Sequence, residues 1–275
     1  MARDHYLQTA GLSPTERRIA GLCHYINERS APKRVQTRFM RLVGRRFVHF
    51  CTGNLVRVRG LEHVHHLNPR GGVLLCSNHR SFFDMYVISA TLFRHQVPWL
   101  RDLYFPVRSD FFYDRWTGLL VNLAMGGGSM YPPIFRDRAR ADLNKLSVSR
   151  IAELLHEPGV VVGMHPEGTR GKGPDPYELL RAQPGAGQMA LQGDASVVPI
   201  WINGMISDFT EQFISNFRTG AGRGRPIDIV FGPPVDLSDL RKEKPRVVLY
   251  KKAADRILEH ILELGHSVRD SVAQP

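Results

Sequence analysis

The amino-acid sequence predicts an α/β fold with a largely buried central sheet. Short apolar runs of strand length alternate with longer segments of helical periodicity from about residue 55 to residue 264, which is typical of this fold class. Several short runs, such as residues 73–76 and 160–162, are apolar without alternation, and such strands are usually covered on both faces. A chain of 275 residues with 43% hydrophobic content can bury one substantial core.

The expected strands are residues 55–59, 73–77, 159–164, 196–202 and 227–231, and the expected helices are residues 83–93, 139–155, 187–192 and 246–264. In the last helix, Ala254, Ile257 and Ile261 recur at core spacing, so it is expected to cover one face of the sheet. Functional residues of such folds lie on the loops at strand ends.

The N-terminal region, residues 1–54, is expected to form an amphipathic hairpin of two helices in front of the larger domain at residues 55–275. A first helix is expected over residues 15–28, ended by a break at residues 30–32. From Arg29 to Arg59 there is no acidic residue, while basic residues crowd the interval: Lys33, Arg34, Arg38, Arg41, Arg45, Arg46 and Arg57. Apolar residues gather on one face at helical spacing: Val35, Phe39, Leu42, Val43, Phe47 and Phe50.

A basic amphipathic helix of this kind has two interpretations. It can lie in the headgroup layer of an anionic membrane, where each Lys or Arg contributes roughly 1 kcal/mol. The same pattern is also typical of a helix that packs on its own domain. The residues alone leave both interpretations open.

The net charge of +11 and a pI near 9.9 indicate anionic partners. Nucleic acid is not expected, because the chain has no zinc-finger spacing, aromatic RNA-binding signature or convincing helix-turn-helix pattern. Cys23, Cys51 and Cys76 form no C-x-x-C pair, which indicates neither a disulfide framework nor a zinc ribbon. No secretory signal or membrane-spanning stretch is visible, so a cytoplasmic protein associated peripherally with a membrane is expected.

The first candidate motif is Asn78-His79-Arg80-Ser81-Phe82-Phe83-Asp84, directly after an apolar strand. Histidine suits proton abstraction near neutral pH, and a carboxylate on its second ring nitrogen would fix the tautomer. Asp84 is a candidate for that carboxylate. The alternative is structural, because Ser81 and Asp84 have the spacing of a helix capping box.

Two later segments supply candidate cations. Strand residues 160–164 lead into the turn His165-Pro166-Glu167-Gly168-Thr169-Arg170, whose Arg170 can bind a phosphate bidentately, with Lys172 as a second cation. Arg136 follows a short apolar stretch; the alternative for it is a surface pair with Asp137 or Asp142. A third group, the histidines at positions 63, 65 and 66, lacks a recognisable ligand spacing, so no metal is expected.

Together these segments resemble the family of glycerophosphate and lysophosphatidate acyltransferases, the PlsC-like acyltransferases. Residues 78–84 resemble the family's N-H-x-x-x-x-D block, residues 134–136 its second block, residues 166–170 its P-E-G-T-R block and residues 197–202 its V-P-I/V block. One H-x-x-x-x-D is common by chance, but four blocks in order over about residues 60–234 are specific.

The resemblance implies a mixed sheet flanked by helices behind an N-terminal two-helix motif on the membrane. It also implies that His79 is the general base and Asp84 its orienting partner. The acceptor's phosphate site would be shaped by Arg136 and by the second turn, namely Glu167, Gly168, Thr169 and Arg170. The sequence departs from the family at Gln183, where a lysine is often found, and at Gly171, where serine is common.

The expected reaction transfers a fatty acyl group from an acyl thioester, acyl-CoA or acyl-ACP, to a hydroxyl of a phosphorylated glycerolipid, most simply 1-acyl-sn-glycerol-3-phosphate. No cofactor is expected, because a thiol leaving group departs with little acid assistance. The alternatives are acylation of glycerol 3-phosphate or another lyso-lipid, and a non-catalytic module that binds anionic lipid or nucleic acid.

Overall fold

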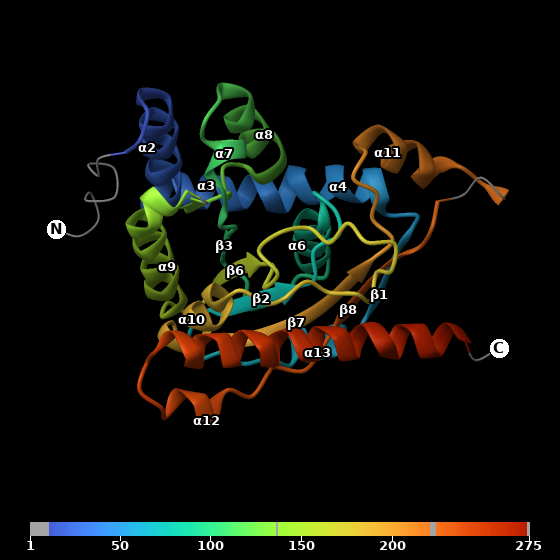
Figure 1. The fold of residues 1–275 in the computed structure, drawn as a ribbon. Helices are drawn as coiled ribbons and strands as arrows, with labels where there is room; N and C mark the ends of the chain where they lie inside the picture. The colour runs from blue at the N-terminus through green and yellow to red at the C-terminus, as the bar shows by residue number, and fades with distance from the viewer. Residues whose placement is uncertain (1–10, 136, 221–223, 274–275) are drawn as a thin grey trace.

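The protein is a three-layer α/β structure, described here from a computed structural model for residues 11–135, 137–220 and 224–273. In Figure 1 the sheet runs through the middle, with α6 and the N-terminal helices above it and the long helix α13 below it. The predicted α/β fold with a central sheet flanked by helices is confirmed.

The central sheet has six strands in the order β1-β8-β7-β2-β6-β3. Their bounds are Val56–Arg59 (β1), Val73–Ser77 (β2), Asp102–Tyr104 (β3), Val160–Met164 (β6), Ser196–Asn203 (β7) and Ile227–Phe231 (β8); β4 (Val107–Arg108) and β5 (Pro133–Ile134) pair separately. Only β7 and β8 run antiparallel among the described pairs of the central sheet, so the sheet is mixed. Every strand predicted from the sequence is present.

Helices cover both faces of the sheet. The helical bounds are Pro14–Glu28 (α2), Ser30–Phe39 (α3), Met40–Gly44 (the π-helix η1), Arg45–Thr52 (α4), Leu61–His65 (α5), Asp84–Arg94 (α6), Ser109–Phe112 (α7), Trp116–Gly126 (α8), Arg138–Arg140 (the 3-10 helix η2), Ala141–Leu155 (α9), Pro184–Gln192 (α10), Phe209–Phe217 (α11), Ser238–Arg241 (α12) and Val247–Ala273 (α13). Helices α10 and α13 pack together under β2 and β7, and α6 packs on α4 above the sheet.

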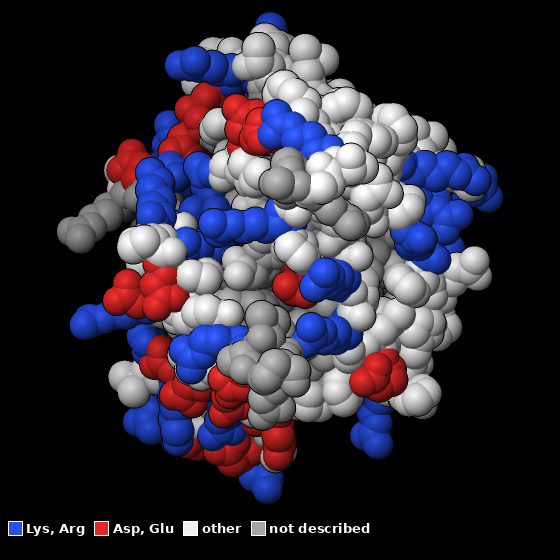
Figure 2. Space-filling view, turned by 90° about the vertical axis from the view of Figure 1, so that its right-hand side faces the viewer, with Lys and Arg blue, Asp and Glu red and all other residues white. Residues whose placement is uncertain are grey.

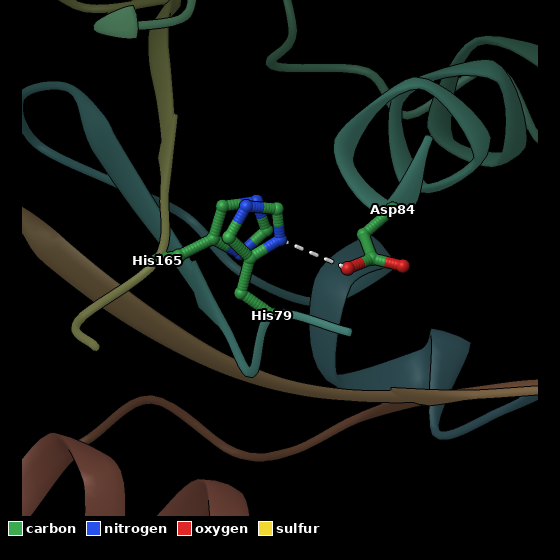
Figure 3. Close-up of side chains that lie close together, drawn as sticks. All are labelled: His79, Asp84 and His165. Carbon is green, nitrogen blue, oxygen red and sulfur yellow. Dashed lines mark hydrogen bonds and ion pairs between the residues drawn. The ribbon is translucent and has the colours of Figure 1, made fainter. Parts of the chain in front are cut away.

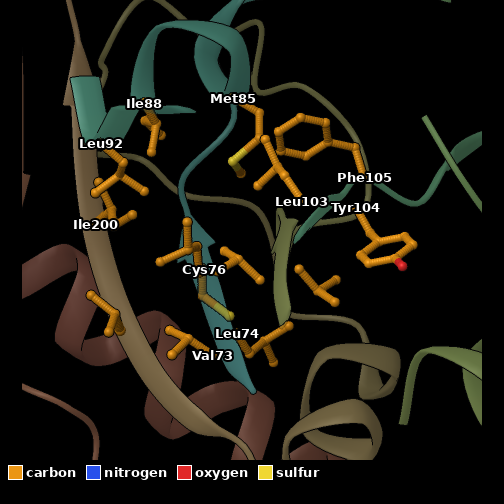
Figure 4. Packing of buried hydrophobic residues seen from close by; sticks show 14 of the residues in the cluster. Val73, Leu74, Cys76, Met85, Ile88, Leu92, Leu103, Tyr104, Phe105 and Ile200 are labelled. Atoms are coloured by element: carbon orange, nitrogen blue, oxygen red, sulfur yellow. The ribbon is translucent and has the colours of Figure 1, made fainter. Parts of the chain in front are cut away.

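The core explains why β2 is apolar at every position. Leu74 and Cys76 of β2 are completely buried, and on the face of the sheet that α6 covers, Ile88 and Leu92 lie beside Ile200 of β7 (Figure 4). Burying a side chain of this size contributes about 1.5–3 kcal/mol. Because both faces of the strand are covered, no position is left for a polar side chain until the strand ends at Ser77.

Sequence analysis missed the short strands β3, β4 and β5 and the helices α5, α7, α8, α11 and α12. Strand β3 has three residues, too few to show a period, and α8 is apolar on all sides with two glycines in it, so neither carries an amphipathic pattern. Within the described ranges, no helix combines the length and the apolar character needed to cross a bilayer.

The predicted N-terminal helices are both present, with one correction to their junction. The chain breaks at Arg29, which has an extended conformation, and Ser30, Ala31 and Pro32 form the first turn of α3 instead of a linker. Proline is tolerated in a first turn because its missing N–H would have no helical partner there. From Ser30 the chain stays helical through η1 to Thr52, and α2 rises away from it toward α8 (Figure 1).

The basic run of these helices divides into packed and exposed members. Lys33 is buried and donates to Asn27 Oδ1 at 2.8 Å and to the Leu103 carbonyl at 2.6 Å. Arg45 donates to the Phe93 carbonyl at 3.0 Å, near the C-terminal end of α6, and Arg41 donates to the Leu100 carbonyl. Cations are favourable at helix C-termini. By contrast, Arg34 and Arg38 are exposed.

Candidate active site

The candidate site lies where β2 and β6 end side by side. His79 follows β2 by two residues, and His165 follows β6 directly. The two strands are parallel neighbours, so their carboxyl ends meet at one edge of the sheet. In open α/β sheets this edge is where ligands bind.

His79 and Asp84 form the contact that the sequence analysis predicted. The distance between His79 Nδ1 and Asp84 Oδ2 is 3.1 Å, and Asp84 is completely buried at the first position of α6 (Figure 3). An ionised carboxylate only accepts hydrogen bonds, so Nδ1 carries the ring proton and Nε2 keeps its lone pair. The imidazole is thereby held in the tautomer of a base.

The structural alternative, a capping box, is only half formed. The Ser81 N–H donates to Asp84 Oδ2 at 2.8 Å, as a capping box requires. The Ser81 hydroxyl, however, donates to the Ile206 carbonyl at 3.0 Å and accepts from the Phe83 N–H at 3.3 Å. The same Asp84 oxygen also accepts from the Arg80 N–H at 2.8 Å. One carboxylate therefore orders the loop and orients the histidine, so the two interpretations coexist.

Asn78 ties this loop to the neighbouring strand, a role that sequence analysis did not assign. Its buried side-chain amide donates to the Ile202 carbonyl and accepts from the Ile202 N–H, both at 2.8 Å. This pair of bonds continues the backbone pattern of β7 onto a side chain. The start of the histidine loop is thus fixed to the sheet.

Glu167 joins the two candidate loops. It is only 2% exposed, and its two oxygens accept from the backbone N–H groups of His79 and Leu180, each at 2.8 Å. The turn that places it depends on Gly168, whose φ of +67° lies in the left-handed region. Glu167 was expected to shape the acceptor site, and the geometry gives it a bracing position with both oxygens occupied. Thr169 is exposed beside it.

Arg170 leans toward the histidine loop. Its guanidinium lies 5.1 Å from the centre of the Phe82 ring and donates to the Ser207 hydroxyl at 3.2 Å. Its charge acts on His79 and lowers the pKa of that group. Lys172 is exposed in the following loop. The other arginine expected at the acceptor site, Arg136, lies outside the described residues, and its role stays a prediction.

Arg80 explains one departure of this sequence from the family pattern. Its Nη2 donates to the Gly173 carbonyl at 2.6 Å, and its Nη1 is buried near Gly171. A β-carbon added at Gly171 would lie 3.1 Å from that Nη1 atom, closer than an ordinary contact. Glycine at this position therefore leaves room for the Arg80 guanidinium. Nothing in the local sequence signals this contact.

The electrostatic environment favours a neutral base beside an ionised carboxylate at neutral pH. Burial and the charge of Arg170 lower the pKa of His79 to about 3. Burial raises the pKa of Asp84 to about 6, and the N–H groups of Ser81 and Arg80 oppose that rise. Near pH 7 the imidazole is neutral and can accept a proton, while the carboxylate can stabilise the imidazolium that results.

The chain is similar to known acyltransferases. A 1-acyl-sn-glycerol-3-phosphate acyltransferase alpha from Ovis aries is 27% identical over 221 residues, which cover 80% of this chain and 66% of that protein, slightly less than two thirds of its length. The crystal structure of the 1-acyl-sn-glycerophosphate (LPA) acyltransferase PlsC from Thermotoga maritima aligns over 95% of this chain and 93% of its own, at 16% identity and a TM-score of 0.49. A family model described as Acyltransferase matches residues 55–203, more than half of the chain. The chain belongs to the acyltransferase family.

Proposed function

We propose that this protein transfers a fatty acyl group from an acyl thioester to a hydroxyl of a phosphorylated glycerolipid, most simply 1-acyl-sn-glycerol-3-phosphate, in phospholipid biosynthesis. The observation that carries the proposal is the contact between His79 Nδ1 and Asp84 at the carboxyl edge of the sheet. Membership of the acyltransferase family supports the reaction class. The Ovis aries relative, named for this acceptor, supports the choice of acceptor.

The mechanism needs one base and no covalent enzyme intermediate. The acceptor hydroxyl gives its proton to His79 Nε2 as its oxygen attacks the thioester carbonyl, and Asp84 stabilises the imidazolium. When the tetrahedral intermediate collapses, the new C–O bond stays and the C–S bond breaks. The thiolate then takes the proton from His79, since a thiol has a pKa near 8.5. Arg170 would bind the acceptor's phosphate, together with Arg136.

Association with a membrane surface is the second part of the proposal. Large apolar side chains are exposed along α3, η1, α4 and α11: Val35, Leu42, Val43, Phe47, Phe50, Phe209, Ile214 and Phe217. Aromatic contacts join α4 to α11, with the Phe47 and Phe209 rings 6.2 Å apart and the Phe50 and Phe217 rings 5.3 Å apart. Figure 2 shows a broad uncharged area in its upper right part, at the level of α4 and α11, with Lys and Arg at its right margin. An apolar face flanked by cations suits an anionic bilayer.

A narrow apolar crevice lies beside this face. It is lined by residues of α4, α6 and α11, among them Phe47, Cys51, Tyr86 and Phe209, and by Phe83, which precedes Asp84. A lipid substrate held in the bilayer would therefore find apolar side chains that continue to Phe83, the neighbour of Asp84 in the chain. This placement supports a lipid acceptor over a soluble phosphate ester.

The test is transfer by the purified protein from labelled acyl-CoA and acyl-ACP to a panel of acceptors. We expect product with 1-acyl-sn-glycerol-3-phosphate and less with glycerol 3-phosphate or other lyso-lipids. If none of the hydroxyl acceptors tested yields product, acyl transfer is contradicted. Retention on DNA that falls steeply with salt, with no binding to anionic vesicles, would favour a nucleic-acid-binding module instead.

A further inference from the structure

His165 is the residue of this site for which neither the sequence motif nor the proposed mechanism has a use. It follows β6 directly and precedes the turn that carries Glu167 and Arg170. The adjacency of β2 and β6 brings its ring against His79. The two imidazoles are stacked with their centres 3.8 Å apart and their planes within 4° of parallel (Figure 3).

The contacts of the His165 Nδ1 atom determine which ring nitrogen carries the proton. Its Nδ1 lies 3.1 Å from the carbonyl oxygens of Ser77 and Asn78 and 3.1 Å from the Ser77 hydroxyl. Carbonyl oxygens only accept, so Nδ1 carries the proton. The ring is thus anchored to the end of β2, the segment that leads into His79. It is an aromatic side chain with its plane and its tautomer both fixed.

A metal site is the first alternative, because ligand atoms of His79, Asp84 and His165 lie within 4.8 Å of one another. Two features speak against it. The lone pair of an imidazole nitrogen lies in the ring plane, and two parallel stacked rings with centres 3.8 Å apart do not direct lone pairs at one ion at the 2.0–2.1 Å typical of zinc–nitrogen bonds. In addition, each Nδ1 already has an oxygen partner. Chelation would require both rings to turn.

We infer that His165 is a positioning residue of the acyl-transfer site: its neutral ring covers one face of His79, excludes water from that face and fixes the plane in which Nε2 meets the acceptor hydroxyl. The inference rests on the proposed function. Misplacing a reacting group by about 1 Å can cost 10²-fold in rate. A neutral neighbour also tolerates the imidazolium that forms on His79, whereas a second cation at this distance would oppose it.

The surrounding charges are consistent with a neutral His165. Burial, and then the proximity of His79, lower the pKa of His165 to about 3, while Asp84 acts in the opposite direction. Among the described residues, the charged groups that act on the stacked pair are Asp84 at the start of α6 and Arg170 in the loop after β6. Arg170 and the burial of both rings favour the uncharged forms. The stack therefore persists as two neutral rings at physiological pH.

Two substitutions separate the ring from its hydrogen bonds. His165→Phe keeps a flat ring but loses the Nδ1 donor, while His165→Asn keeps a donor for the Ser77 and Asn78 carbonyls but has no ring. We expect His165→Phe to retain kcat within about threefold and His165→Asn to lose about 10- to 100-fold, with the acceptor KM changed little in both. His156→Asn, at an exposed histidine after α9, is the matched control.

A readout that does not require turnover keeps this inference separate from the proposed function. The titration of the His79 ring, followed by NMR, should move to higher pH in His165→Asn, because water reaches the uncovered face, and should move less in His165→Phe. Unchanged kcat and unchanged His79 titration in a folded His165→Asn protein would overturn the positioning role. If the wild-type protein transfers no acyl group, the proposed function fails, while the NMR comparison still decides whether His165 controls His79.

Discussion

Titratable side chains have different environments in the two candidate site loops and in the N-terminal helices. In the loops, Asp84 and Glu167 are buried and His79 is partly buried, and backbone N–H groups hold the two carboxylates in place. In the N-terminal helices, Arg34 and Arg38 extend into solvent on the flank of an apolar face. Both groups are prominent in the sequence, and the pKa values of His79 and Asp84 in the loops are shifted in the way found at reacting sites.

The difference is set by desolvation. A charge in water is screened and interacts weakly with its neighbours, whereas a buried one must be paired and responds strongly to them. The basic run of the N-terminal helices itself contains both kinds of residue. Lys33 and Arg45 donate to carbonyl groups of the sheet domain, whereas Arg34 and Arg38 are exposed. Substitutions of buried and of exposed charged residues should therefore differ in their effects on activity, stability and vesicle binding.

The largest effect is expected from the proposed base. His79→Ala should lower kcat by at least about 10³-fold, and Asp84→Asn by about 10²-fold, because an amide can still accept from the Ser81 N–H but cannot stabilise the imidazolium. Transfer of labelled acyl groups measures both, and circular dichroism checks folding. Wild-type turnover by a folded His79→Ala protein would remove His79 as the base.

Lys33 should make stability depend on pH in a way that no exposed cation does. Burial lowers the pKa of Lys33 to about 7, against about 10.4 in an unfolded chain. Between these values the unfolded state binds more protons, so this group makes the free energy of unfolding rise with pH, by on the order of 3 kcal/mol from pH 7 to pH 10. Urea unfolding of wild type and Lys33→Met should show that difference. Parallel pH curves for the two proteins would contradict it.

Arg170→Ala should act on both acceptor binding and the base. We expect about a 30-fold rise in KM for the phosphorylated acceptor, corresponding to about 2 kcal/mol for a charge-assisted hydrogen bond. Because Arg170 lowers the pKa of His79, its removal should also shift the titration of that group to higher pH. A monoacylglycerol acceptor without phosphate is the control: an equal loss with it would argue against phosphate recognition.

The smallest effects should separate the exposed and packed arginines of one helical run. Arg38→Gln should weaken binding to anionic vesicles by about 1 kcal/mol, roughly fivefold, and leave unfolding unchanged. Arg45→Gln should instead lower stability by about 1 kcal/mol, because the Phe93 carbonyl loses its donor. Vesicle co-sedimentation and thermal unfolding of both variants measure this. Equal vesicle binding by Arg38→Gln and wild type would contradict a headgroup role for that residue.

Much of the fold was accessible from the sequence because the pattern there is strong. Every predicted strand and helix of the α/β domain appears in the structure, with small shifts at most ends, although the last helix continues to Ala273 instead of ending at residue 264. The elements between residues 102 and 126 were missed, since a three-residue strand and a helix apolar on all sides carry no period. The predicted contact between His79 and Asp84 is present, and its alternative as half of a capping box is present as well.

The sequence by itself determined which chemistry is available: a histidine and an aspartate five positions apart after an apolar strand, a turn bounded by proline and glycine, and a run of basic residues without acidic ones. Only the tertiary structure decided which of these groups meet. The ring of His165 against His79, the Glu167 brace and the burial of Lys33 all join residues far apart in the chain. Such contacts depend on strand order and helix packing, which place side chains by long-range burial and leave no local pattern to detect.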